Sequence, residues 1–302
     1  MTQDTYALAV HGGAGNAPLW SNSHEREALK ESLALALETG QSMLRRGATS
    51  VDTVEAVTRS LEDDPYFNAG HGSFPNYNGE FELDASIMEG GSGNCGAVAG
   101  VRTIRNPVSA ARAVMDHSPH VLLCGTGADE FAKKFGMDLV ESDYFRTEHR
   151  MAAWQRARRR AADSSPANDH LGTVGCVALD QNGNLAAATS TGGITLKRFG
   201  RVGDSPLIGA GTYANNKTCA VSCTGNGEQF IKHCVAFSVS ALMHYRGWKI
   251  GDAVDHVVDH ILPDRCGGLI AVGRDGSLSV RFNTRGMNRG LADFTGRFEV
   301  GI

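Results

Sequence analysis

Apolar and polar residues alternate along the chain in a pattern that predicts strands and amphipathic helices in two successive groups. The first group opens with an apolar strand over residues 6–10, which ends at the glycine-rich segment His11–Gly15, expected to form a tight turn. The elements predicted after it are helices at 25–46 and 51–62, the second beginning after Ser50, strands at Phe81–Met88 and Ala97–Val101, a helix from Pro107 to 117, a strand at Val121–Cys124, and helices at 128–135 and 147–162.

The second group follows residues 163–171, which have no hydrophobic periodicity and are expected to form a flexible linker. The elements predicted beyond it are strands at 173–179, 185–191, near 207–209 and 219–223, an apolar helix at 228–245, a helix at 250–261, and a hairpin over 268–282 that turns at Arg274–Gly276. Because strands cluster between pairs of helices in both halves, the pattern predicts an α/β (α+β) fold. Two stacked sheets with helices on both outer faces would form a four-layer αββα sandwich.

Composition narrows the classes of function. The 302 residues carry a net charge of −4 and a sequence pI near 6.3, so neither nucleic acid nor an anionic membrane is an expected partner. Seven cysteines without a C-x-x-C pair indicate reduced thiols and a cytoplasmic location. The chain shows no signal-peptide pattern and no apolar run long enough to cross a membrane.

The segment Gly172–Gly175 gives the strongest indication of a catalytic residue. It reads Gly-Thr-Val-Gly and precedes a short apolar run. If the Gly172–Thr173 bond is broken, Thr173 gains an α-amine whose reference pKa is about 7.7–8.0. That amine can take the proton from the threonine's own hydroxyl, so one residue would supply both nucleophile and general base. The four residues alone, however, are more typical of a loop that enters a buried strand.

Other motifs are weaker. Gly91–Gly96 and Gly209–Ala214 match glycine-rich nucleotide fingerprints, but neither leads into a predicted helix. His256 and His260 lie four residues apart on a predicted helix and could face a metal, although a solvated charged face explains them as well. The sequence of His11–Ala14 is similar to an α/β-hydrolase oxyanion turn, but the chain contains no G-x-S-x-G nucleophile elbow.

Seven segments, taken in order, resemble the plant-type L-asparaginase/isoaspartyl peptidase family of N-terminal-nucleophile hydrolases. The segments are His11–Gly15, Asn68–Ser73, Glu82–Met88, Gly172–Gly175, Ser190–Gly193, Gly200–Pro206 and Thr224–Glu228, and together they span nearly the whole chain. The αββα fold of that family agrees with the pattern of elements. The resemblance implies a single domain that cleaves itself before Thr173 into an α chain (1–172) and a β chain (173–302), which stay associated in a dimer of αβ units.

The resemblance also implies an activity and its catalytic residues. The protein would hydrolyse L-asparagine to L-aspartate and ammonia and remove isoaspartyl residues from β-aspartyl dipeptides, without a catalytic cofactor. Thr173 would be the nucleophile and would form a β-aspartyl ester, with Asn68 and Thr191 positioning it. The Thr224 hydroxyl and the Gly225 backbone N–H would stabilise the developing oxyanion.

Substrate and ion binding follow from the same resemblance. Arg201 would hold the substrate α-carboxylate with its guanidinium fork, and Asp204 would pair with the α-ammonium, although residues three apart could also form a surface ion pair. Family members hold a structural sodium ion through backbone carbonyls, which correspond here to Leu61, Glu62, Asp64, Phe67, Ala69 and His71. A histidine is unexpected at position 71, so its role stays open.

Three alternatives share parts of these motifs. A glycosylasparaginase typically has aspartate before its nucleophile and belongs to secreted proteins with disulfides, whereas this chain has Gly172. A threonine endopeptidase of the same superfamily would need an extended protein-binding insertion, which the sequence does not suggest. A non-catalytic amino-acid-binding relative would not need Thr173, Thr191 and Thr224 together. The preference between asparagine and β-aspartyl dipeptides stays open, because the predicted binding residues contact a part common to both.

Overall fold

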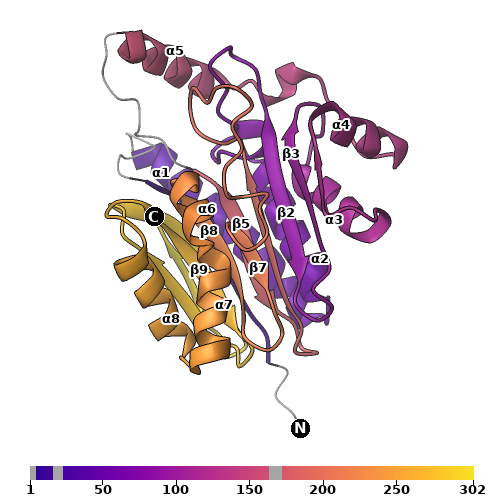
Figure 1. The fold of residues 1–302 in the computed structure, drawn as a ribbon. Helices are drawn as coiled ribbons and strands as arrows, with labels where there is room; N and C mark the ends of the chain where they lie inside the picture. Colours follow the sequence, from indigo (N-terminus) through magenta and orange to yellow (C-terminus); the bar gives the residue numbers. More distant parts are fainter. Residues whose placement is uncertain (1–4, 16–22, 163–171) are drawn as a thin grey trace.

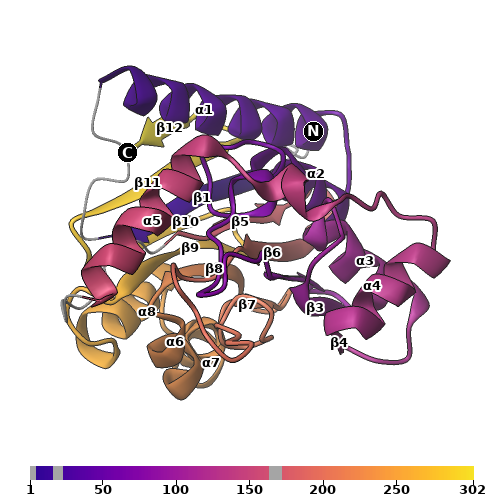
Figure 2. The ribbon, with the colours of Figure 1, turned by 90° about the horizontal axis from the view of Figure 1, so that it is seen from above.

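The computed structural model describes residues 5–15, 23–162 and 172–302. Two β-sheets lie face to face between layers of helices, which confirms the predicted αββα sandwich (Figure 2). The described strands of the larger sheet are, in spatial order, β12 (Phe298–Gly301), β11 (Gly286–Asp293), β1 (Ala7–Gly15), β5 (Val174–Leu179), β6 (Leu185–Thr191), β2 (Leu83–Glu89), β3 (Cys95–Val101) and β4 (Leu122–Cys124). Those of the smaller sheet are β10 (Leu278–Phe282), β9 (Gly267–Gly273), β8 (Cys219–Gly225) and β7 (Thr212–Ala214).

Helices cover the outer face of each sheet (Figure 1). The larger sheet packs against α1 (Ser23–Arg45), α2 (Ser50–Glu62) and α3 (Pro107–His117), and the smaller sheet against α7 (Val235–Arg246) and α8 (Ile250–His256). The remaining α-helices of the described chain are α4 (Gly125–Lys134), α5 (Glu148–Ala162) and α6 (Gly227–His233). The leucines that predicted the first helix, Leu29, Leu33, Leu37 and Leu44, are all buried, so the amphipathic pattern identified the packed face.

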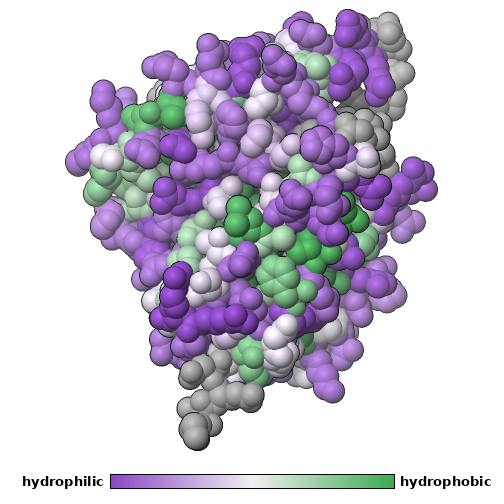
Figure 3. All heavy atoms as spheres, turned by 180° about the vertical axis from the view of Figure 1, so that it is seen from behind, coloured by the Kyte–Doolittle hydropathy of each residue, from purple (hydrophilic) through white to green (hydrophobic). Residues whose placement is uncertain are grey.

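The space between the sheets is lined by apolar side chains, and several of them are alanines. Ala7 and Ala9 on β1, Ala187 on β6 and Ala220 on β8 are fully buried there. Such residues let two sheets pack closely without cavities. On the face opposite to that of Figure 1, hydrophilic side chains predominate and apolar areas are of limited extent (Figure 3).

The structure corrects two predictions near the N-terminus. His11–Gly15 is not a tight turn but continues β1, with an irregular register between His11 and Ala14 and a left-handed Gly13 at φ +106°. The second helix begins at Ser50, and Thr49 caps it by accepting the Asp52 N–H at 3.1 Å. The N–H of Ser50 instead donates to the carboxylate of Asp180 at 2.9 Å, a tertiary contact that local patterning does not reveal.

Two further predictions are wrong in the second half, and two strands there were missed. The long apolar helix is two helices, α6 and α7, separated by Cys234 at φ +46°, because the first N–H groups of α7 donate to the carbonyls of Gly209 and Ala210. The strand expected near 207–209 is replaced by β7. Strands β11 and β12 were not predicted, since few of their residues alternate in polarity. The predicted linker, residues 163–171, lies outside the described residues.

Candidate active site

Thr173 lies at the start of β5, directly after the bond predicted to break. Its Oγ1 donates to the Thr191 hydroxyl at 3.2 Å, at the end of the neighbouring strand β6. The Thr191 hydroxyl donates in turn to the carbonyl oxygen of Gly172 at 3.1 Å and accepts the N–H of Gly193 at 3.0 Å. One hydroxyl therefore contacts both the predicted nucleophile and the carbonyl beside it.

Asn68 reaches the same carbonyl from the loop that follows α2. Its Nδ2 donates to the carbonyls of Gly172 at 2.7 Å and Gly193 at 2.6 Å, while its Oδ1 accepts the N–H of Phe74 at 2.8 Å. These three contacts fix the orientation of the amide. The Gly172 carbonyl thus accepts hydrogen bonds from Asn68 and Thr191, which are placed to stabilise negative charge on that oxygen.

A pocket beside Thr173 brings together most of the other predicted site residues, but Asn68 and Thr224 do not line it. Its lining residues are Gly172, Thr173, Thr191, Gly193, Ile194, Arg201, Gly203, Asp204, Ser205 and Gly225. The free volume is about 10 Å³, which is too small for an amino acid. Because Gly172 forms part of the wall, separation of Gly172 from Thr173 would enlarge the pocket.

Asp204 places an unsatisfied carboxyl group in this pocket. The side chain is buried, and its Oδ2 has no hydrogen-bond partner among the described residues. Burial raises the pKa of Asp204 to about 7, despite the nearby positive charge of Arg201. A bound ammonium group would supply donors to Oδ2 and favour the ionised carboxylate, so the geometry suits the predicted contact with a substrate α-amine.

Arg201 does not pair with Asp204. Its Nε and Nη2 donate to the two carboxylate oxygens of Glu228, each at 2.9 Å. The Arg201 side chain is 16% exposed and that of Glu228 50%, so the pair lies at the pocket rim. A Cβ at Gly203 would lie 2.8 Å from Arg201 Nη1, which places the other edge of the fork against the pocket wall. Sequence reasoning missed Glu228, although it ends a matched motif.

Thr224 and Gly225 lie at the end of β8, on the opposite sheet. The fully buried Thr224 hydroxyl accepts the N–H of Ala14 at 3.2 Å, and no acceptor among the described residues takes its proton. Gly225 lines the pocket with φ +156°, and a side chain there would collide with the Cys266 carbonyl and Gly267. Glycine therefore allows the backbone to approach the pocket.

His11 is a second residue to which the sequence assigned no role. Its ring is fully buried at the end of the apolar part of β1, and Nδ1 lies 3.0 Å from the carbonyl oxygen of Thr173. In the sequence, the feature that could have pointed to a role for His11 is its position at the end of an apolar strand.

Residues 61–72 form the loop in which the resemblance implies a sodium ion. A Cβ at Gly70 would lie 2.2 Å from the Glu62 carbonyl oxygen, and one at Gly72 would lie 2.1 Å from that of Phe67. Glycine thus allows backbone carbonyls to crowd together in this loop, including the short 3-10 helix η1 (Gly70–Gly72), and carbonyl oxygens suit a hard cation. The buried guanidinium of Arg150 donates to another carbonyl of the loop, that of Tyr66, at 2.9 Å.

The open question at position 71 has a structural answer. His71 is partly buried, and its Nδ1 donates to the backbone carbonyl of Tyr144 at 2.5 Å, with the two rings 4.8 Å apart. This side chain therefore joins the loop to the 3-10 helix η2 (Ser142–Phe145).

The described parts of the chain contain neither a side-chain metal cluster nor a membrane-spanning helix. In those residues no cluster of three or more His, Cys, Asp and Glu side chains could hold a metal ion, and His256 and His260 simply lie 5.3 Å apart, ring to ring. Within the same ranges, no helix has both the length and the apolar character that crossing a bilayer requires.

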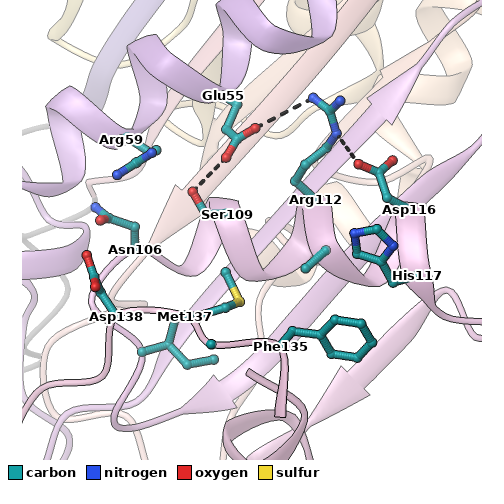
Figure 4. A pocket seen from close by; sticks show the side chains of 13 residues that line it. Glu55, Arg59, Asn106, Ser109, Arg112, Asp116, His117, Phe135, Met137 and Asp138 are labelled. Carbon is teal, nitrogen blue, oxygen red and sulfur yellow. Dashed lines mark hydrogen bonds and ion pairs between the residues drawn. The ribbon is translucent and has the colours of Figure 1, made fainter. Parts of the chain in front are cut away.

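A larger cavity lies between α2, α3 and residues 135–138 (Figure 4). Its volume is about 410 Å³, and four of its polar side chains form a connected set. Glu55 accepts the Ser109 hydroxyl at 2.7 Å and lies 3.5 Å from Arg112, which also pairs with Asp116 at 2.7 Å. No residue of the seven matched motifs lines this cavity.

Comparison with known proteins identifies the family. A family model described as asparaginase matches residues 4–302. The chain is 43% identical to the probable isoaspartyl peptidase/L-asparaginase 2 of Arabidopsis thaliana, over 98% of both chains. It is 48% identical to the isoaspartyl peptidase of Escherichia coli, over 93% of this chain and 91% of that protein. It is 40% identical to the human isoaspartyl peptidase/L-asparaginase, over 98% of this chain and 95% of that protein. With its αββα layers and its ordered motifs, the chain belongs to the asparaginase family of N-terminal-nucleophile hydrolases.

Proposed function

We propose that this protein is a self-processing isoaspartyl peptidase and L-asparaginase with Thr173 as its nucleophile. The observation that carries the proposal is the arrangement around one peptide bond: the Thr173 hydroxyl lies beside it, and two donors contact the Gly172 carbonyl. The names of the relatives supply the substrate class, because they are isoaspartyl peptidases and L-asparaginases.

Self-cleavage would use the two hydrogen-bond donors that already contact the Gly172 carbonyl, Asn68 and Thr191. Thr173 Oγ1 attacks the carbonyl carbon of Gly172, while Asn68 and Thr191 stabilise the oxyanion. The C–N bond breaks and the nitrogen takes the hydroxyl proton, which leaves an ester on Thr173 Oγ1 and a free α-amine. Water then hydrolyses the ester, so that the α chain (1–172) ends in a carboxylate and the β chain (173–302) begins with threonine.

The new α-amine would then serve as the base for hydrolysis. It takes the proton from Thr173 Oγ1, which attacks the side-chain carbonyl of asparagine or the isopeptide carbonyl of a β-aspartyl dipeptide. The Thr224 hydroxyl and the Gly225 N–H stabilise the oxyanion. The leaving nitrogen takes the proton and departs as ammonia or as an amine, and water hydrolyses the β-aspartyl ester to release aspartate.

The remaining binding roles complete the proposal. Arg201 binds the substrate α-carboxylate and Asp204 binds the α-ammonium, so the pocket selects an α-amino acid head. A structural sodium ion, held by backbone carbonyls of residues 61–71, would stabilise the loop that carries Asn68. A dimer of αβ units and a cytoplasmic location follow from the resemblance and from the composition.

Intact-mass measurement tests self-cleavage. Denatured wild-type protein should give two fragments that meet between Gly172 and Thr173, whereas Thr173→Ala should remain one inactive chain. A wild-type protein that is active while wholly uncleaved would contradict the proposal.

A substrate panel tests the specificity. L-Asparagine and β-aspartyl dipeptides should both release aspartate. α-Aspartyl dipeptides should not, because the scissile carbonyl moves, nor should N-acetyl-asparagine, because it lacks the charge that Asp204 pairs with. Aspartate release mainly from glycosylated asparagine would favour a glycosylasparaginase. No turnover of any compound by fully cleaved protein would favour a non-catalytic binding protein.

A further inference from the structure

A row of buried hydroxyl groups runs between the two sheets and ends at His11. The Ser222 hydroxyl on β8 lies 2.9 Å from His11 Nε2 and 2.7 Å from the hydroxyl of Thr189 on β6. Thr212 on β7 donates to Thr189 at 2.6 Å. The hydroxyl of Ser86 on β2 lies 2.8 Å from that of Thr212. All of these side chains are fully buried, in a layer that is otherwise lined by apolar residues.

The contact between His11 and the Thr173 carbonyl determines which groups of the row donate and which accept. A carbonyl oxygen can only accept, so His11 Nδ1 carries the proton that it shares with the Thr173 carbonyl, at 3.0 Å. Burial lowers the pKa of His11 to about 3, so the ring is neutral and Nε2 is an acceptor. Ser222 therefore donates to Nε2 at 2.9 Å, the shorter of its two acceptor contacts, the other being the Ala188 carbonyl at 3.2 Å. Its single proton is then used, and Thr189 must donate to Ser222.

The far end of the row reaches the substrate pocket. The Ser86 hydroxyl lies 2.6 Å from the carbonyl oxygen of Ser205, which lines the pocket next to Asp204. The row thus extends from the wall of the predicted amino-acid site to the carbonyl of the predicted nucleophile. The single Ser86 proton can serve either the Ser205 carbonyl or Thr212, so the fixed order of donors runs from Thr212 to the Thr173 carbonyl. Hydrogen bonds ordered in this way hold the buried groups in one arrangement.

The row also accounts for the second glycine of the Gly-Thr-Val-Gly segment. A Cβ at Gly175 would lie 2.1 Å from the Ser222 hydroxyl and 2.6 Å from His11 Nε2. Any side chain at this position would separate the hydroxyl from the ring. Gly175 directly opposes His11 in the pairing of β1 with β5, so the backbone is built to admit this contact.

We propose that His11, held by the hydroxyls of Ser222, Thr189 and Thr212, is a positioning residue for the N-terminal nucleophile. The inference rests on the proposed function of Thr173. After cleavage, Thr173 is a chain end and loses its covalent link to Gly172. The bond from His11 Nδ1 to its carbonyl then fixes the residue from the C-terminal side, so that its amine and hydroxyl keep the orientation needed for attack.

The test is kinetic and uses the complete, fully processed protein. Ser222→Ala should lower kcat by about tenfold to 100-fold, because small misplacements of a reacting group have effects of that size. KM should change less than twofold, since Arg201 and Asp204 are untouched. Ser240→Ala is the matched control: it removes a buried hydroxyl bonded to Thr218 at 2.6 Å, outside the row, and should leave kcat unchanged.

Two substitutions of His11 distinguish a role in positioning Thr173 from a role in packing the interior. His11→Asn can place an amide donor near the Nδ1 position, whereas His11→Gln places its amide near the Nε2 position. We expect His11→Asn to retain at least about tenfold more kcat than His11→Gln. A wild-type kcat and cleavage rate in Ser222→Ala would overturn the proposal even if the His11 variants fail to fold. Wild-type protein that neither cleaves nor hydrolyses any substrate would instead overturn the proposed function.

Discussion

Two cavities of this protein differ in size and in how their polar groups are satisfied. The cavity beside α3 has a volume of about 410 Å³, and its Arg112 pairs with Glu55 and Asp116 (Figure 4). The pocket beside Thr173 has a free volume of about 10 Å³, yet it contains Asp204, whose Oδ2 lacks a partner within the described part of the chain.

This difference shows that an unsatisfied buried group is a better sign of a binding site than empty volume. Burying a carboxyl group without a hydrogen-bond partner costs free energy of folding. A ligand that supplies the missing donors removes that cost, whereas the paired charges of the larger cavity need no ligand. Substitutions at the two cavities test this contrast.

The largest effect is expected for the donors to the Gly172 carbonyl. Asn68→Ala should slow self-cleavage by about 10²–10³-fold, because removal of one oxyanion donor has an effect of that size. Thr191→Val should act similarly, while Thr191→Ser keeps the hydroxyl and should cleave nearly normally. The fraction of uncleaved chain, followed over time by denaturing electrophoresis, measures the rate. Cleavage of Asn68→Ala at the wild-type rate would rule out this role.

A somewhat smaller effect is expected for the guanidinium fork. Arg201→Lys should lower kcat/KM by about 10²-fold, since a point charge cannot replace a bidentate donor whose loss costs about 2–5 kcal/mol. Arg198→Ala is the control, because that side chain stacks 3.8 Å from the ring centre of Tyr77 and does not line the pocket. Initial rates with both substrate types provide the comparison, and an unchanged kcat/KM in Arg201→Lys would exclude the carboxylate role.

The unsatisfied carboxyl of Asp204 predicts an effect on stability. Its pKa is raised to about 7 in the folded chain, against about 3.9 when unfolded. Such a group contributes stability that is present below the unfolded pKa and lost as the pH rises towards the folded pKa. In a Thr173→Ala background, which keeps the chain uncleaved, Asp204→Asn should therefore gain stability relative to its parent between pH 4 and pH 7.

The gain would be roughly 4 kcal/mol at most, from about 1.4 kcal/mol for each unit of the pKa difference. Thermal unfolding at pH 4 and pH 7.5 measures it. We expect similar midpoints for the two proteins at pH 4 and a midpoint several degrees higher for Asp204→Asn at pH 7.5. Parallel pH profiles would show that the carboxyl is satisfied after all, and the contrast between the cavities would lose its main support.

The sequence predicted most of the elements that have a clear period. Four leucines at helical spacing located α1, and apolar runs located β5 and β6. Local patterning failed where distant contacts decide the structure. The break at Cys234 depends on the carbonyls of Gly209 and Ala210, which meet α7 only in the folded chain.

For the candidate site too, the sequence predicted the motif residues but not the contacts between distant parts of the chain. Motif resemblance located Thr173, Thr191 and Asp204, and the structure brings all three to one pocket. The motif resemblance could not reveal that Glu228 binds one edge of the Arg201 guanidinium, because the two residues are 27 positions apart in the sequence. Nor could it reveal the bond from His11 to the Thr173 carbonyl, which spans 162 positions.

The smallest effect is expected in the larger cavity. Arg112→Ala removes ion pairs with Asp52, Glu55 and Asp116 that are partly exposed to solvent, and such pairs contribute about 0–1 kcal/mol each. We expect kcat/KM within twofold of the wild type and only a small fall in the unfolding midpoint. Because this variant changes the larger of these two cavities without touching an unsatisfied group, a tenfold loss of activity would mean that the cavity communicates with Thr173. Volume would then have been the better guide to function than unsatisfied polar groups.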